Sequence, residues 1–197
     1  SLLRGFSAPV KLICEYSKEE LSHLASHDSD GFSRWDAGNR LYNMVLLDYV
    51  DSLSKGHEPL KDDYVISVFS SILDDQTIEP AVAALMLQIP SDKALYGLLS
   101  KIDPHYVSKA RKFARVMLNE ALNENIYSKY NQLCFDEEFL PSAEQIGERS
   151  LKNTLLGYLV LDKGNGLKTV YDQFQSATNM TDKTSALNLL INHDKDD

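Results

Sequence analysis

Apolar residues recur at intervals of three and four along most of this chain, a spacing that places them on one face of an α-helix. One broad apolar stripe lies in the segment 32–54 and includes Trp35, Leu41, Val45, Leu46, Val50 and Leu53. A second stripe lies in the segment 103–133 and includes Val107, Ala110, Ala114, Met117 and Ala121. The pattern predicts a long amphipathic helix over each of these segments.

Capping residues and helix breakers mark the ends of the predicted helices. Ser17 and Glu20 form a capping box in front of a short helix that runs to about residue 27. Asp103 and Pro104 supply a cap and a first helical residue for the long helix that follows them. Further helices are expected over about 62–73, 77–89 with Thr77 as its cap, 91–100, 142–163, 167–177 and 182–192 with Thr181 as its cap.

The expected fold class is all-α. Only the segment 10–16 shows a partly alternating pattern, so a short extended segment is predicted there. Roughly eight or nine helices with short connections favour antiparallel helical hairpins, packed as a bundle or as a curved superhelical array. We expect an interdomain junction and extended segment over 1–16, and a helical domain over 17–197 that is truncated at its C-terminal end. No fixed sequence period supports a strict repeat family.

Composition and charge exclude several function classes. The chain carries 20 Lys and Arg against 29 Asp and Glu, for a net charge of -9, and the basic residues are scattered among acidic ones. Phosphate backbones require clustered positive charge, so no nucleic-acid partner is expected. No apolar run approaches the roughly 20 residues of a membrane span, so no membrane partner is expected either. Cys14 and Cys134 form no C-x-x-C pair and are predicted to be buried thiols in a reducing compartment.

The histidine pair His23 and His27 is the sharpest candidate for chemistry. Histidines at positions i and i+4 lie on one helix face, as in zinc peptidases. However, Leu24 stands where H-E-x-x-H has its general-base Glu, although Asp28 or Asp30 is available as a third ligand. Exposed imidazoles near a helix C-terminus are the preferred interpretation. A metal hydrolase built on this histidine pair is the alternative.

The remaining motifs indicate structure rather than catalysis. Asn179-Met180-Thr181 matches a glycosylation sequon, but a helix cap is also required at this point. The acidic clusters 136–138 and 194–197 lack the spacing and Gly of a calcium loop and are interpreted as solvated charge. There is no phosphate-binding loop and no G-x-S-x-G elbow. We therefore predict no catalytic, cofactor-binding or metal residue in this chain.

Several strings in this sequence resemble one family. The first residues, SLLRGFSAPVKL, resemble the junction that leads into the C-terminal helical domain of the bacterial aminopeptidase N family, which are zinc metallopeptidases of the gluzincin type. The segments 27–37, 103–104, 148–153 and 177–182 resemble later parts of that domain in the same order. The resemblance is strongest over 1–40 and 176–187. It implies that the chain is the N-terminal portion of that domain, cut from a longer polypeptide.

The family's own chemistry lies outside this chain. Neither H-E-x-x-H nor G-x-M-E-N occurs here, and no Tyr matches the context of the family's catalytic Tyr. The resemblance implies a parent enzyme in the bacterial cytoplasm that binds zinc and removes N-terminal residues from peptides. This piece would bind no zinc, would be inactive alone, and would bound the active-site chamber against the catalytic domain of the same polypeptide. A standalone helical protein-binding scaffold is the alternative. The fragment hypothesis also predicts an apolar face that is left exposed.

Overall fold

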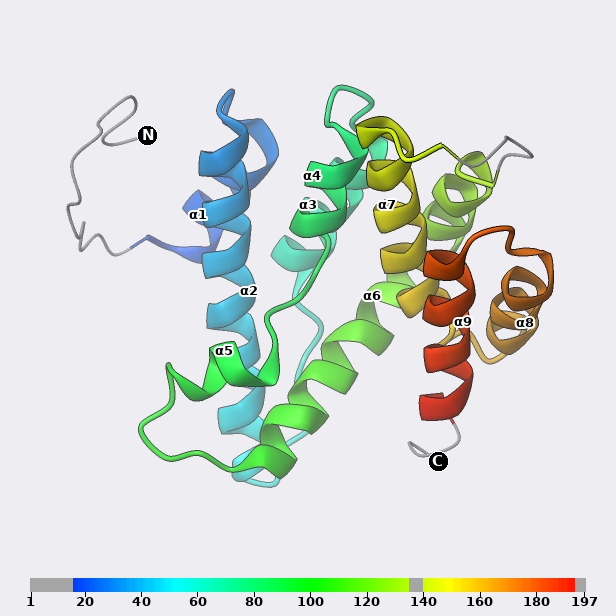
Figure 1. The fold of residues 1–197 in the computed structure, drawn as a ribbon. Coiled ribbons are helices and arrows are strands. Elements are labelled where there is room, and N and C mark those ends of the chain that lie inside the picture. The colour runs from blue at the N-terminus through cyan, green and yellow to red at the C-terminus, as the bar shows by residue number, and fades with distance from the viewer. Residues whose placement is uncertain (1–15, 135–139, 194–197) are drawn as a thin grey trace.

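The computed structural model describes residues 16–134 and 140–193, and these ranges fold into nine helices with no strand among them (Figure 1). The helices are α1 (Lys18–His27), α2 (Gly31–Ser54), α3 (Asp63–Asp74), α4 (Pro80–Met86), α5 (Asp92–Tyr96), α6 (Pro104–Gln132), α7 (Ala143–Leu159), α8 (Gly166–Ser176) and α9 (Met180–His193). The prediction of an all-α fold is confirmed. The predicted extended segment 10–16 and both acidic clusters lie almost wholly outside the described residues.

Consecutive helices pack as hairpins in a row. The α1 helix packs against α2 and α3, and α2 also packs against α6. The short α4 lies along α7, and α7 in turn contacts α6, α8 and α9. Figure 1 shows α1 and α2 at one end of this row and the α8–α9 hairpin at the other. The arrangement agrees with the curved-array form of the predicted fold.

Most helix ends lie where the capping signals predict them. The Ser17–Glu20 capping box forms as expected, and the Asp103 carboxylate accepts from the backbone at the start of α6. The Thr77 prediction is wrong, because α4 begins at Pro80 without a side-chain cap and the Thr77 hydroxyl donates to Asp75 instead (2.6 Å). The Thr181 prediction is also wrong, because the Asn179 side chain accepts from the backbone of Asp182 (2.9 Å).

One continuous apolar core runs through the described helices, from α1 to α9. Near its centre the Phe69 and Tyr158 rings meet edge to face with centroids 5.0 Å apart. The Tyr158 hydroxyl donates to the Leu87 carbonyl (2.6 Å) and so joins α7 to the end of α4. The predicted stripes on α2 and α6 supply many buried members of this core. Ile146 of α7 lies outside this core and is 54 % exposed, although the apolar spacing of α7 would place it inward.

Two glycines allow backbones to approach closely. A Cβ at Gly147 would lie 2.9 Å from the Ala81 backbone nitrogen, so the missing side chain lets α7 contact α4. A Cβ at Gly166 would collide with the Leu159 carbonyl oxygen and lie 2.9 Å from that of Val160. The sequence predicts Gly166 only as a breaker between helices. In the structure it is buried and is the first residue of α8, so it fixes the tight turn from α7.

Candidate functional site

The histidine pair lies on one face of α1, as predicted. The His23 and His27 rings are exposed, with centroids 5.0 Å apart and planes inclined by 61°. Within the described residues, no three His, Cys, Asp or Glu side chains are grouped so that they could hold a metal ion. This pair therefore has only two of the three or more protein ligands that zinc sites use.

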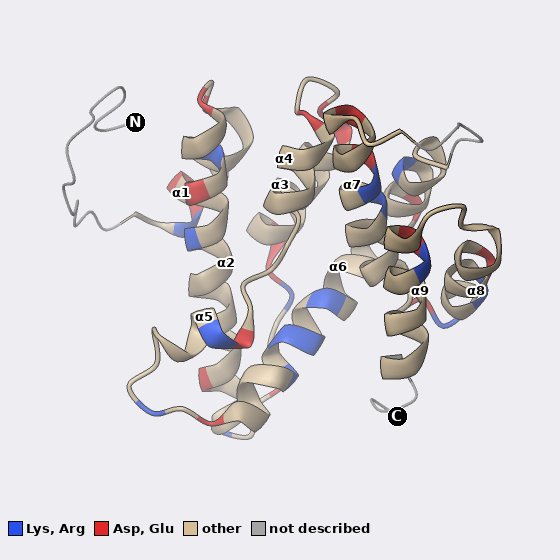
Figure 2. Ribbon diagram, in the orientation of Figure 1, with Lys and Arg blue, Asp and Glu red and all other residues tan. Residues whose placement is uncertain are grey.

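Basic side chains are concentrated on the first half of α6, as Figure 2 shows. Some of these basic side chains are used in contacts within the chain. The Arg111 guanidinium donates to the Pro90 carbonyl (2.8 Å) and pairs with Asp92 on α5. The Arg115 guanidinium donates to the Gly157 carbonyl on α7. These two arginines hold α5 and α7 against α6, which is a structural role.

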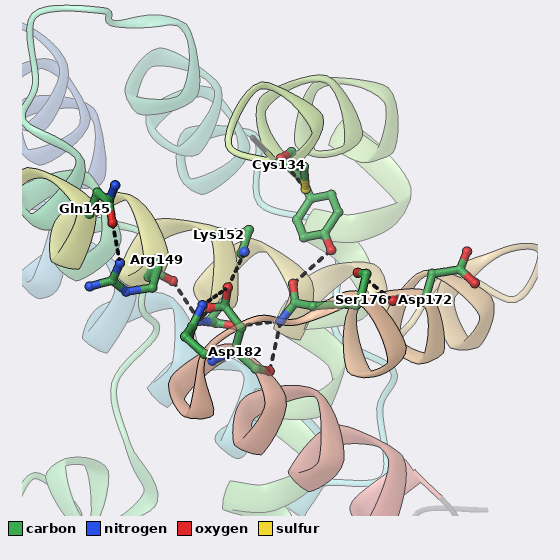
Figure 3. Close-up of polar contacts among 11 residues, drawn as sticks. Cys134, Gln145, Arg149, Lys152, Asp172, Ser176 and Asp182 are labelled. Atoms are coloured by element: carbon green, nitrogen blue, oxygen red, sulfur yellow. Dashed lines mark hydrogen bonds and ion pairs between the residues drawn. The ribbon is translucent and has the colours of Figure 1, made fainter. Parts of the chain in front are cut away.

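A polar cleft lies where α6, α7, α8 and the start of α9 meet. It encloses about 460 Å³ and is lined mainly by polar side chains. Figure 3 shows that Lys152 of α7 and Asp182 of α9 point toward one another here, with Cys134 beyond the end of α6. The segments 148–153 and 177–182, which carry part of the family resemblance, are far apart in sequence and meet in this cleft.

A buried carboxylate organises the cleft. The Asp182 side chain is only 3 % exposed and forms an ion pair with Lys152. Its oxygens also accept from the side-chain amides of Asn153 (2.7 Å) and Asn179 (3.1 Å). Burying a charge is costly unless it is paired and hydrogen-bonded, and both conditions are met here. The arrangement attaches the first turn of α9 to α7.

A second set of hydrogen bonds extends this network to α6 and α8. The Gln173 amide donates to Asn153 Oδ1 (2.8 Å) and to the Asp182 carbonyl (3.1 Å). Its oxygen accepts from the Tyr130 hydroxyl (2.9 Å). Burial raises the pKa of Tyr130 well above its ordinary value, so this phenol stays protonated and donates. Four helices are thus joined through one set of satisfied polar groups (Figure 3).

The chemistry of this cleft favours structure over catalysis. The negative charge of the Asp182 carboxylate is paired with the Lys152 ammonium. The raised pKa of the Tyr130 phenol keeps it protonated. Cys134 was predicted to be buried but is exposed, and its thiol donates to the Tyr130 carbonyl (3.3 Å). Asn179, the sequon residue, is half-buried and uses its side-chain amide on Asp182, which agrees with a capping role. Sequence reasoning missed the network, because its members are polar residues in different helices.

A comparison with known protein families identifies the family of this chain. A family model described as "Domain of unknown function (DUF3458_C) ARM repeats" matches residues 18–197. This chain belongs to the DUF3458_C family. The description as ARM repeats agrees with a curved helical array, whereas the sequence shows no period that would have identified the repeats. Helices that range from 5 to 29 residues in length conceal such a period.

Curated relatives of this DUF3458_C chain carry the name aminopeptidase N. The chain is 32 % identical over 192 residues to aminopeptidase N of Escherichia coli (strain K12), covering 97 % of this chain and 22 % of the relative. It is 30 % identical over 188 residues to that of Caulobacter vibrioides, covering 95 % and 21 %. The resemblance stated from sequence is confirmed. The chain spans about a fifth of the length of these relatives and corresponds to a helical domain within them.

A solved structure supports the same assignment. The fold matches the structure titled "Crystal structure of Legionella pneumophila aminopeptidase A in complex with aspartic acid" with a TM-score of 0.79 and 25 % identity, covering 96 % of this chain and 23 % of that chain. No helix in the described residues is long and apolar enough to cross a membrane. This DUF3458_C chain is therefore similar, over nearly its whole length, to a helical part of these longer aminopeptidases.

Proposed function

We propose that this DUF3458_C chain is a non-catalytic domain of a zinc aminopeptidase, an enzyme that removes N-terminal residues from peptides in the bacterial cytoplasm. The observation that carries the proposal is the match to aminopeptidase N over 97 % of this chain. In this proposal the domain bounds the active-site chamber and limits which peptides enter.

The zinc ion of the proposed enzyme does not fit the residues of this chain. A catalytic zinc needs three protein ligands and an open position, and the described residues offer only the exposed His23 and His27 on one helix face. We therefore assign the zinc to the catalytic domain of the same polypeptide and give no residue of this chain a part in the reaction.

In this proposal the chain forms a rigid wall of the active-site chamber. A close-packed core keeps the helices in fixed positions, and the satisfied network at Asp182 holds the α8–α9 hairpin on α7. A wall that does not deform can keep the size of a chamber constant while peptides of different length enter it.

The test is to express the full reading frame that contains this chain beside the isolated chain. With an amino-acid p-nitroanilide as the probe, we expect turnover by the full protein, loss with a chelator and recovery with zinc. The isolated chain should show no turnover. A full-length protein without H-E-x-x-H upstream of Ser1, or without turnover, contradicts the proposal.

A standalone protein-binding scaffold is the second candidate, and exposed apolar residues on α8 and α9 favour it. One observation distinguishes these two candidates, namely what precedes Ser1 in the reading frame. A start codon directly before Ser1 supports the scaffold, whereas a reading frame that continues into a peptidase domain supports the enzyme.

A further inference from the structure

A glycine follows Asn165 in the turn between α7 and α8. Asn165 is the one asparagine of this sequence that stands directly before a glycine. Asparagine is a thermolabile residue, because the backbone nitrogen of the next residue can attack its side-chain amide. Glycine has no Cβ, so the nitrogen of Gly166 is less hindered than the nitrogen that follows any other asparagine here. The sequence therefore makes the Asn165–Gly166 bond the most reactive of its kind in the chain.

The structure shows why a glycine is required at this position. Gly166 is buried, and a Cβ on it would collide with the Leu159 carbonyl oxygen and lie 2.9 Å from that of Val160. These are backbone atoms, which cannot rotate away as a flexible side chain would. The turn therefore requires glycine at 166, and that requirement leaves Asn165 beside an unhindered nitrogen.

The side chain of Asn165 is not used as a helix cap. Asn165 is the N-cap residue of α8 and is exposed, yet its side chain accepts no capping hydrogen bond. Asn179 offers the contrast, because its side-chain oxygen accepts from the backbone of Asp182 (2.9 Å). A cap of that kind would hold the amide away from its own backbone. The Asn165 amide lacks this restraint and can turn toward the nitrogen of Gly166.

The attacking nitrogen, by contrast, is held by the turn. The Gly166 N–H donates to the Asp162 carbonyl (2.9 Å), so its proton is engaged in a hydrogen bond. The Asp162 carboxylate accepts from the backbone of Gly164 (3.1 Å) and of Asn165 (3.2 Å), and from the Tyr127 hydroxyl (3.2 Å). Attack requires the Gly166 nitrogen to lose its proton, so the turn must open first. The reaction rate should therefore follow the frequency of this local opening.

We propose that Asn165 is a deamidation site whose reactivity is controlled by opening of the turn between α7 and α8. The Gly166 nitrogen forms a bond to Cγ of Asn165, the bond from Cγ to Nδ2 breaks, and ammonia leaves with the proton from Gly166. The product is a five-membered cyclic imide. Water then opens this ring at either carbonyl, which gives an ordinary aspartyl or an isoaspartyl residue at position 165. Both products carry a carboxylate where the chain had an amide.

The two products should act differently on α8. An aspartyl carboxylate at the N-terminus of a helix interacts favourably with the helix dipole. An isoaspartyl residue lengthens the main chain by one carbon directly before Gly166, which has no room to shift against Leu159 and Val160. The isoaspartyl form should therefore loosen α8, and with it the hydrogen bond from Tyr130 to Gln173. Deamidation would thus weaken the attachment of the α8–α9 hairpin.

Peptide mapping by mass spectrometry of the full-length protein that contains this chain tests the proposal. Samples are kept at mildly alkaline pH, under native conditions and in urea, and the deamidated fraction at each asparagine is followed with time. Trypsin isolates Asn165 in the peptide 164–168. Asn131 and Asn188 are exposed and precede no glycine, so they serve as internal controls. Enzymatic methylation of isoaspartyl groups identifies the second product.

Asn165 should be the first asparagine to react under both conditions. In the native protein it should react at least about tenfold more slowly than in urea, because it reacts only through local opening. Asp162→Ala removes the carboxylate that holds the turn and should raise the native rate toward the rate in urea. Asp172→Ala is the matched control in the exposed Lys168–Asp172 pair of α8, and it should leave the rate unchanged.

Tyr127→Phe is the second variant, for the case that Asp162→Ala does not fold. It removes only the hydroxyl that donates to Asp162, and it should raise the native rate by a smaller factor. The proposal is overturned if a control asparagine reacts before Asn165 in the native protein, if native and urea rates are equal, or if a folded variant at 162 or 127 reacts no faster. An isoaspartyl form that unfolds at the same urea concentration as the unmodified protein would contradict the weakening of α8. The measurement does not depend on turnover, so it stands apart from the proposed function.

Discussion

The two ends of this molecule share one apolar core but differ in how much they depend on buried polar contacts. The α1–α4 end packs on α6 through apolar side chains such as Leu41, Val68 and Phe69, each of which is fully buried. The α8–α9 end also buries Val170 and Ala186 in the core, but its attachment to α7 and α6 includes a buried polar network of Asp182, Gln173 and their partners. Apolar burial is non-directional and tolerates exchange of similar side chains, whereas a buried polar network depends on each member. The α8–α9 end should therefore be the more sensitive to single substitutions.

The largest expected effect is at Asp182. Asp182→Asn keeps the size of the side chain but leaves the Lys152 ammonium, 14 % exposed, without its counter-charge. Removing one partner of a buried pair costs about 3–5 kcal/mol, and we expect a loss of that order in the free energy of unfolding in urea. The control is Asp172→Asn on the exposed Lys168–Asp172 pair, where the loss should stay within about 0.5 kcal/mol. Similar losses in the two variants would mean that the network does not attach α9.

A smaller loss is expected at the turn into α8. Gly166→Ala places a methyl group against the Leu159 and Val160 carbonyl oxygens, which belong to the backbone and cannot rotate away. We expect a loss of about 1–3 kcal/mol, measured by thermal unfolding. Gly31→Ala is the matched control, because no atom lies within 4 Å of its added Cβ, and it should be neutral or slightly stabilising. Unchanged stability of Gly166→Ala would show that this turn relaxes freely.

Two buried tyrosines in the apolar core, Tyr42 of α2 and Tyr158 of α7, differ in whether their hydroxyls are hydrogen-bonded. The Tyr158 hydroxyl donates to Leu87, whereas the buried Tyr42 hydroxyl has no hydrogen-bond partner among the described residues. Tyr158→Phe should cost about 1 kcal/mol, because it leaves a buried carbonyl without its donor. Tyr42→Phe should be neutral or stabilising, because it removes a buried polar group that is unpaired. Chemical unfolding of both variants checks this order, and a larger loss for Tyr42→Phe would reverse it.

The smallest effect concerns Asp75 at low pH. The Thr77 hydroxyl, the Thr77 backbone N–H and the Arg34 guanidinium donate to this carboxylate and lower its pKa from 3.8 to about 2. A pKa that is lower in the folded state stabilises the fold above about pH 4, and this contribution is lost as the pH falls toward 2. Thr77→Val should move the pKa of Asp75 back toward 3.8. An NMR titration of the carboxyl carbon measures it, and an unchanged pKa would exclude the hydroxyl as the main cause.

Sequence predicted those features of the fold that depend on neighbours along the chain. The caps at Ser17 and Asp103 follow from residues within one turn, so they were predicted correctly. Thr77 and Thr181 failed as caps because nearby polar groups, Asp75 and Asn179, form the competing hydrogen bonds. The backbone of α6 departs from helical geometry at Leu122, with φ -127° and ψ 21°, although α6 contains no Gly and no Pro after its first residue. No sequence signal marks that kink.

The polar network in the cleft could not be predicted from the sequence, for a different reason. Lys152 and Asp182 are 30 residues apart, and Tyr130 and Gln173 are 43 apart. A periodic pattern identifies which face of a helix is buried, but it does not identify the polar partner on another helix.

The close approach of Gly147 to Ala81 has a consequence for synthesis of the chain on the ribosome. A helix of seven residues is not stable alone in water, so α4 needs the surface of α7 to persist. That surface is translated more than 50 residues after α4. We therefore expect α4 to stay without regular structure while α5 and α6 are made, and hydrogen exchange on stalled nascent chains would show its amides becoming protected only after residue 159 has emerged.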